Sequence, residues 1–125
     1  MPPAIEILGS DKGPTGEINL TGRIENDHIE PQGFTNFAVI VENNAGINIS
    51  DYIVFVQRTV GELMVYPGHA LIAELVAGKT EECNFLVYNP SSDEQASFTF
   101  RIRTRYNSHL GVINREWKFV IPPPQ

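Results

Sequence analysis

The sequence predicts an all-β protein, an antiparallel sandwich of about seven to nine strands. Its clearest strand is the run 97–106, in which apolar and polar residues alternate strictly. One face carries Phe98, Phe100, Ile102, Thr104 and Tyr106, and the other carries Thr99, Arg101, Arg103 and Arg105. Successive side chains of a strand point to opposite faces, so this period of two indicates an antiparallel sheet with one dry and one solvated face. Turn-forming residues separate several such runs, and a convincing helical period is absent.

Length and composition indicate one globular domain. The chain has 125 residues, of which 42% are hydrophobic and 19% charged, and this is enough to build a core without disulfide bonds. We expect a single domain over residues 1–125, with the sandwich in about 15–121 and a proline-rich tail or linker at 122–125. The net charge of −6 argues against nucleic acid as the main partner. The apolar runs are too short for insertion into a membrane.

The sequence leaves the cellular compartment open. A single cysteine, Cys83, excludes an intramolecular disulfide, which is compatible with both secreted and cytosolic proteins. Residues 1–4 have neither the basic region nor the apolar stretch of a signal peptide. If the protein is exported, we expect its signal to lie outside this segment.

Two strands are expected in the N-terminal part. Ile5–Leu8 is a short apolar run, and we place it at a sheet edge because the turn-forming residues 9–14 follow at once. Residues 17–24 alternate in polarity, and the inner face should carry Ile18, Leu20 and Ile24.

Two longer strands follow. Phe34–Glu42 comes after the polar loop 27–33 and leads into Asn43–Gly46, a turn in which glycine adopts a positive φ at little cost. The segment 52–58 is apolar on both faces, as expected of a strand in the middle of a sheet, and we assign Phe55 to its inner face.

Three further strands are expected before the run 97–106. Glu62–Tyr66 and His69–Leu75 are short, and Pro67 with Gly68 interrupts any helix across them. Lys79–Tyr88 alternates again, and its inner face should carry Cys83, Phe85 and Val87.

The last two strands predict a hairpin of defined register, with a loop at 107–112. The expected pairs are Tyr106 with Ile113, Ile102 with Trp117, Phe100 with Phe119, Arg103 with Glu116, and Arg105 with Asn114. A shift by one residue would place Arg103 opposite Arg115 and Trp117 beside Arg101, which opposes like charges and exposes the indole. The favoured register leaves Arg115 on the inner side near Thr104, where its aliphatic stem lets the guanidinium reach water.

These faces define an expected inner layer, in which Trp117 is the largest contributor. Its members are Leu20, Phe37, Val39, Phe55, Phe85, Val87, Phe98, Phe100, Ile102, Trp117 and Phe119.

The order of features resembles an immunoglobulin-like sandwich found in prokaryotic surface proteins. A strand that ends in an Asn-rich turn with glycine (37–46), an apolar strand (52–58) and the segment Leu75–Thr80 before an alternating strand give this rhythm. Over roughly residues 34–121 the chain resembles the cell-adhesion-related bacterial domain family. The resemblance implies a non-catalytic adhesion or spacer module of a multidomain protein, extracellular or at the cell surface, with neighbouring domains and a protein or glycan partner.

The sequence offers no catalytic signature. It has no Gly-x-Ser-x-Gly motif and no phosphate-binding glycine loop, and Cys83 lies where a small buried core residue is expected. The histidines are not spaced as metal ligands. Glu25, Asp27 and Glu30 could supply oxygen ligands to calcium, but a solvated loop is the simpler interpretation. We expect a protein that is not an enzyme and holds neither metal nor cofactor.

Arg101, Arg103 and Arg105 are the main candidates for binding. They project from one face of one strand at intervals of about 6.5–7 Å, with Lys118 opposite Arg101. We call these four residues the arginine stripe. Guanidinium groups bind carboxylates and sulfates through two parallel hydrogen bonds, which indicates an anionic partner. The alternative is a solvated face that Glu116 and neighbouring acids neutralise.

Three functions remain open from the sequence. The first is the surface spacer or adhesion module. The second is a carbohydrate- or small-ligand-binding module that uses exposed aromatic residues such as Tyr52, Tyr66 or Tyr88. The third is a cytoplasmic adaptor that binds peptides along the edge of a sheet.

Overall fold

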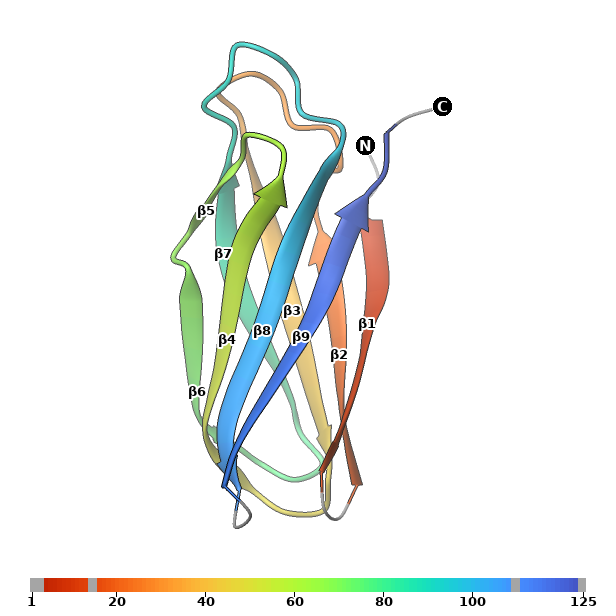
Figure 1. Ribbon diagram of the computed structural model, residues 1–125, viewed down its shortest axis with the longest axis vertical. Coiled ribbons are helices and arrows are strands. Elements are labelled where there is room, and N and C mark those ends of the chain that lie inside the picture. Colours follow the sequence, from red (N-terminus) through yellow and green to blue (C-terminus); the bar gives the residue numbers. More distant parts are fainter. Residues whose placement is uncertain (1–3, 14–15, 109–110, 124–125) are drawn as a thin grey trace.

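The computed structural model describes residues 4–13, 16–108 and 111–123, and in this part of the chain nine strands form two antiparallel sheets (Figure 1). The order is β1-β2-β3-β7-β5 in one sheet and β6-β4-β8-β9 in the other. The strands are β1 (Ala4–Gly13), β2 (Gly16–Ile24), β3 (Phe34–Asn44), β4 (Ile49–Val60), β5 (Met64–Tyr66), β6 (His69–Leu75), β7 (Thr80–Tyr88), β8 (Phe98–Ser108) and β9 (Gly111–Ile121). This confirms the predicted all-β sandwich.

The strand order is that of an immunoglobulin-like sandwich. Strands β2, β3 and β7 pair as A, B and E do in that fold, and β4, β8 and β9 pair as C, F and G do. Strand β6 adds to the second sheet beside β4, and β1 adds to the first sheet beside β2. The middle position of β4 is the one expected from its apolar residues on both faces.

The core lies between the two sheets and is rich in aromatic rings. The centroid of Phe37 lies 4.8 Å from that of Phe119 and 5.0 Å from that of Phe100. Nine members of the predicted inner layer are buried, namely Leu20, Phe37, Val39, Phe85, Val87, Phe98, Phe100, Ile102 and Phe119. These contacts join β3 of one sheet to β8 and β9 of the other.

Two members of the predicted inner layer differ from the expectation: Phe55 lies on the other face, and Trp117 lies on the inner face, opposite Ile102, but is not fully buried. Phe55 pairs with Arg103 and lies half-buried on the outer face, because Val54 and Val56 take the inner positions of β4. Trp117 is only partly buried, since β9 is an edge strand and the indole packs beside Gly9 of β1. A β-carbon built at Gly9 would lie 2.5 Å from Trp117 Nε1, so the glycine makes room for the indole.

Gly22 makes a similar space inside the sandwich. It lies between Leu20 and Ile24 on the inner face of β2, and a β-carbon there would lie 2.7 Å from Cδ2 of Phe119. The added β-carbon would also lie 3.3 Å from Cζ of Phe37. The ring of Phe119 thus fills the space that a side chain at Gly22 would occupy.

The predicted register of the last hairpin is confirmed at all five predicted pairs, and Thr104 pairs with Arg115 as expected. The predicted loop at 107–112 is wrong, because pairing continues through Asn107 with Val112 and Ser108 with Gly111. The residues that join the two strands lie outside the described ranges.

The first strand is longer than the sequence indicated. The short strand Ile5–Leu8 was expected to stop at a turn over 9–14, but β1 continues to Gly13. A register shift between Ile7 and Gly9 accommodates one extra residue in β1, and pairing with β2 continues after it. The edge position of this segment is confirmed.

Strand β1 brings both ends of the chain to the same end of the sandwich. Ala4 at the start of β1 pairs with Ile24, and Ile121 at the end of β9 pairs with Phe98 (Figure 1). In the immunoglobulin-like arrangement without β1, the chain would enter through β2 at the opposite end. Pro122 and Pro123 follow β9 without regular structure.

Two buried asparagines fasten the loops at the two ends of the sandwich. Asn43 Nδ2 donates to the carbonyls of Ile47 and Leu75, and its Oδ1 accepts from the Ala45 N–H, each at 2.9 Å. Asn89 Nδ2 donates to the carbonyls of Ile29 (3.0 Å), Glu30 (3.1 Å) and Asp93 (2.8 Å), and its Oδ1 accepts from the Ser91 N–H (2.9 Å). Each side chain ties together backbone groups of neighbouring loop residues, and the Ile29 and Glu30 carbonyls also accept from the N–H groups of Gln95 and Gly33.

Candidate functional site

The arginine stripe lies on the outer face of the second sheet. Strand β8 holds its three arginines at alternate positions between β4 and β9, so each has a neighbour on both sides. The rows are Gln57, Arg101 and Lys118; Phe55, Arg103 and Glu116; and Ile53, Arg105 and Asn114. Arg103, Arg105 and Lys118 are exposed, and Arg101 is half-buried. The solvated face predicted from the sequence is therefore present, whereas its role in binding stays a prediction.

The ion pairing on this face differs from the pairing expected from the register. Glu116 was expected to neutralise Arg103, its direct neighbour, but its carboxylate pairs with the Nε of Arg101. The guanidinium of Arg103 lies over the ring of Phe55 instead, 5.1 Å from the centroid. This cation–π contact holds the guanidinium group against an apolar ring, while Arg103 as a whole stays exposed.

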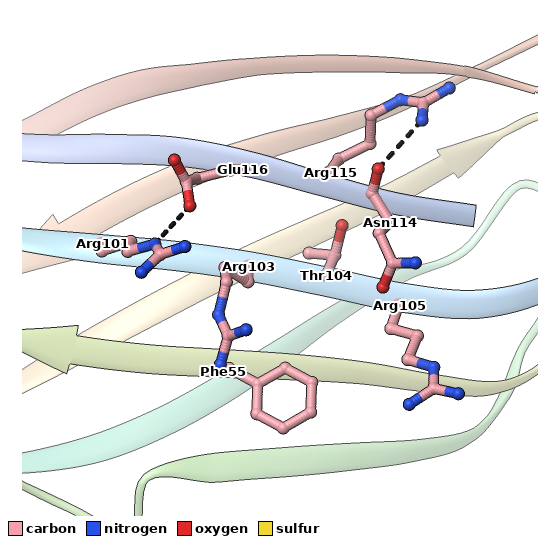
Figure 2. A pocket seen from close by; sticks show the side chains of 8 residues that line it. All are labelled: Phe55, Arg101, Arg103, Thr104, Arg105, Asn114, Arg115 and Glu116. Atoms are coloured by element: carbon pink, nitrogen blue, oxygen red, sulfur yellow. Dashed lines mark hydrogen bonds and ion pairs between the residues drawn. The ribbon is translucent and has the colours of Figure 1, made fainter. Parts of the chain in front are cut away.

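Two guanidinium groups of the stripe consequently face solvent without an ion pair. Among the described residues, no carboxylate lies within ion-pair distance of Arg103 or Arg105. Figure 2 shows both side chains reaching from β8 over β4, while Glu116 stands on β9. The free positive charge thus lies on the β4 side of the stripe.

A shallow groove of about 360 Å³ runs over this part of the sheet (Figure 2). It is lined by Phe55, Arg101, Arg103, Thr104, Arg105, Asn114, Arg115 and Glu116. Arg115 donates to the Asn114 carbonyl at 2.9 Å and is exposed, as its position near the strand end predicted. The groove combines cationic hydrogen-bond donors with one aromatic ring, a set suited to binding anions rather than to covalent catalysis.

The opposite sheet carries a second exposed surface, which we call the aromatic patch. It consists of Phe34, Met64, Tyr66, Leu86 and Tyr88. Tyr88 pairs with Phe34 on one side and with Met64 on the other, and Leu86 pairs with Tyr66. The side chain of Tyr66 is 74% exposed and that of Phe34 is 62% exposed. Exposed apolar side chains that adjoin in this way are typical of interaction surfaces.

The sequence revealed this patch only in part. Tyr66 and Tyr88 were named as exposed aromatics; Tyr66 is exposed, but Tyr88 is half-buried. Phe34 was missed, although it lies on the outward face of β3. Tyr52 was wrongly expected to be exposed: it is fully buried and stacks on Tyr106 with centroids 5.5 Å apart. Its position on the inner face follows from the register of β4 with β8.

Cys83 is buried in the core, as predicted. Burial raises the pKa of its thiol to about 11, and the nearby carboxylates of Glu81 and Glu82 act in the same direction. The thiol is therefore protonated at neutral pH, and protonated thiols are poor nucleophiles.

The acidic loop considered as a calcium site is held by other contacts. Glu25 lies 3.4 Å from Arg23 Nε, and His28 Nδ1 lies 2.8 Å from Glu94 Oε1. Within residues 4–13, 16–108 and 111–123, no three acidic, histidine or cysteine side chains gather as metal ligands. These ranges also contain no helix long and apolar enough to cross a membrane.

The sheet edges bear on the adaptor hypothesis. Strands β6 and β9 are the edges of the second sheet, and β1 and β5 are those of the first. Of these, β9 packs beside β1 through Trp117 and Gly9, while β6 carries the 57% exposed Leu71. Peptide binding along β6 stays a prediction.

No family model matches the chain, and no curated protein matches it. The resemblance to the cell-adhesion-related bacterial domain family accordingly remains a prediction.

Proposed function

We propose that this protein is a non-enzymatic interaction module that binds an acidic protein partner on the arginine stripe. The observation that carries the proposal is the pair of exposed guanidinium groups, Arg103 and Arg105, that form no ion pair with a described carboxylate. They stand on a protein whose net charge is −6, so this face differs in sign from the molecule as a whole.

The physical basis is local electrostatics at short range. At physiological ionic strength the Debye length is about 8 Å, so acids on distant faces contribute little to the field at the stripe. A carboxylate that approaches Arg103 meets a guanidinium already oriented by Phe55, which reduces the side-chain entropy lost on binding. Bidentate contacts to arginine also favour carboxylates over less directional anions.

The placement of the chain ends favours an interaction module over a spacer. A spacer in a row of domains is entered at one end and left at the other. Here Ala4 and Ile121 lie at the same end of the sandwich, so domains attached to them would sit side by side (Figure 1).

We place the module in a multidomain protein that is extracellular or at the cell surface, with the cytoplasm as the alternative. The support is the resemblance to bacterial adhesion domains. Protease treatment of intact cells that express the full-length protein would test the location. Digestion without lysis supports it, and protection until lysis contradicts it.

The binding face can be tested by NMR titration with a penta-glutamate peptide at low salt. We expect saturable shifts confined to β8, β9 and the adjacent part of β4, including the Nε–H signals of Arg103 and Arg105. The double variant Arg103→Gln/Arg105→Gln should lose these shifts. Lys79→Gln, a neutralisation in an exposed turn, should keep them. Shifts that map to the other sheet, or that never saturate, would refute the proposal.

The aromatic patch supports a second candidate function, the binding of a carbohydrate. Sugar rings pack on exposed aromatic faces, and Tyr66 offers the most exposed ring of the patch. The rings of Phe34 and Tyr88 lie 4.8 Å apart and extend the surface. A glycan array would show saturable binding that Tyr66→Ala abolishes and Arg105→Gln leaves unchanged. An array without any bound glycan would remove this candidate.

A further inference from the structure

We infer that the arginine stripe recognises an extended peptide segment in which acidic residues alternate with other residues. This inference rests on the proposed function and specifies the partner's conformation. Its basis is the match between two periods, that of the arginines along β8 and that of side chains along an extended chain.

The arginines follow the pleat of a strand. Arg101, Arg103 and Arg105 occupy alternate positions of β8 on one face, which places neighbouring Cα atoms about 6.5–7 Å apart. A second extended chain laid along β8 also presents alternate side chains on one side with the same period. A segment of the pattern acid-x-acid-x-acid therefore directs each carboxylate at one arginine.

The charge pattern of the face limits the length of this segment. The row from Arg101 to Arg105 spans about 13 Å, which corresponds to five extended residues. Beyond Arg105, Asp51 lines a small hollow together with Ile53, Arg105 and Tyr106, so a longer polyanion would meet a like charge there. A short acidic peptide suits this face better than a long nucleic acid or a sulfated polysaccharide.

Glu116 has a defined role in this arrangement. Its carboxylate already occupies Arg101, so a bound peptide gains its main contacts from Arg103 and Arg105. The intramolecular carboxylate competes with the ligand for the third arginine. Removing its charge should make all three arginines available and strengthen binding.

The test uses the full chain and three labelled heptapeptides of equal composition, measured by fluorescence anisotropy. One has three glutamates at alternate positions, one has them in a contiguous block, and one has two of them four residues apart. We expect the alternating peptide to bind tightest. Arg103→Gln and Arg105→Gln should each weaken its binding by about twofold to fivefold, as expected for exposed ion pairs. Glu116→Gln should strengthen it by a similar factor, and Lys79→Gln should leave it unchanged.

The outcomes separate this inference from the proposed function. If the alternating and block peptides bind equally and Arg103→Gln still weakens both, the inference is overturned and the acidic-partner function stands. Tighter binding of the peptide with glutamates four residues apart would indicate a helical ligand and also overturn it. If a single-stranded oligonucleotide outcompetes the alternating peptide, the partner is a nucleic acid and not an acidic peptide, and the inference is overturned. If no peptide binds and the penta-glutamate titration also produces no saturable shifts, both proposals fail.

Discussion

Gly22→Ala tests how the two sheets fit together. Gly22 faces the ring of Phe119, which is fully buried and also contacts Phe37. The new methyl group would lie 2.7 Å from Cδ2 of that ring, about 0.7 Å closer than the 3.4 Å at which ordinary contacts begin. Neither ring can swing into solvent, so the sheets must separate locally or the rings must leave their preferred rotamers.

The expected loss combines two opposing effects. Overpacking a well-filled core costs about 1–3 kcal/mol. Replacing glycine also restricts the unfolded chain, which returns about 0.4–1 kcal/mol. We therefore expect the free energy of unfolding to fall by about 1–2 kcal/mol. For a domain of this size the midpoint of thermal unfolding should fall by about 4–8 °C.

The assay is urea unfolding followed by tryptophan fluorescence, with Gly68→Ala as the matched control. A β-carbon at Gly68 meets no atom within 4 Å, so this variant should stay within about 0.5 kcal/mol of the parent protein. The double variant Gly22→Ala/Phe119→Leu should be more stable than the sum of the single losses predicts, because the smaller side chain relieves the overlap. A Gly22→Ala protein as stable as the parent, or strictly additive losses, would refute the reasoning.

Three further changes test other contacts. Asn89→Ala should lower the free energy of unfolding by about 2–4 kcal/mol, because it removes four hydrogen bonds to backbone groups. The carbonyls of Ile29 and Glu30 keep the N–H groups of Gln95 and Gly33 as donors, so the loss falls mainly on the Asp93 carbonyl and the Ser91 N–H. A loss below about 1 kcal/mol in urea melts would contradict this. Trp117→Ala should cost about 2–3 kcal/mol, less than the 3–5 kcal/mol of a fully buried tryptophan, since the indole is partly exposed; a loss above about 4 kcal/mol would indicate deeper burial. Cys83 should react with a thiol reagent at pH 8 only at the rate of unfolding. Its pKa of about 11 in the folded state lies above that of the unfolded chain, so the free energy of unfolding should fall as the pH rises from about 9 to about 11, and Cys83→Ala should flatten that fall.

The strongest sequence predictions came from strands with unlike faces. In 97–106 four of the five residues on one face are apolar, and three arginines share the other face. A slip by one residue would oppose Arg103 to Arg115 and place Trp117 beside Arg101, so the register with β9 was predictable pair by pair. Where both faces are apolar, as in β4, the pattern does not distinguish them. Phe55 was therefore assigned to the wrong face, and Tyr52 was expected in solvent although it is buried.

The candidate site shows the same division. Alternation along β8 predicted that Arg101, Arg103 and Arg105 share a solvated face. It did not predict that Glu116 would form its ion pair with Arg101 instead of Arg103, or that Arg103 would lie over the ring of Phe55. Those contacts depend on side-chain rotamers and on which strand lies on the other side of β8.

By itself, the sequence determined the all-β class, most strand positions, the inner faces of the alternating strands and the register of the last hairpin. All of these follow from polarity that repeats every two residues along a single strand. Only the tertiary structure decided that β1 packs beside β9 and that Gly22 makes room for Phe119. It also decided that Phe34 lies in one patch with Tyr66 and Tyr88. These features arise between strands far apart in the sequence, where packing and strand order, rather than local periodicity, set the neighbours.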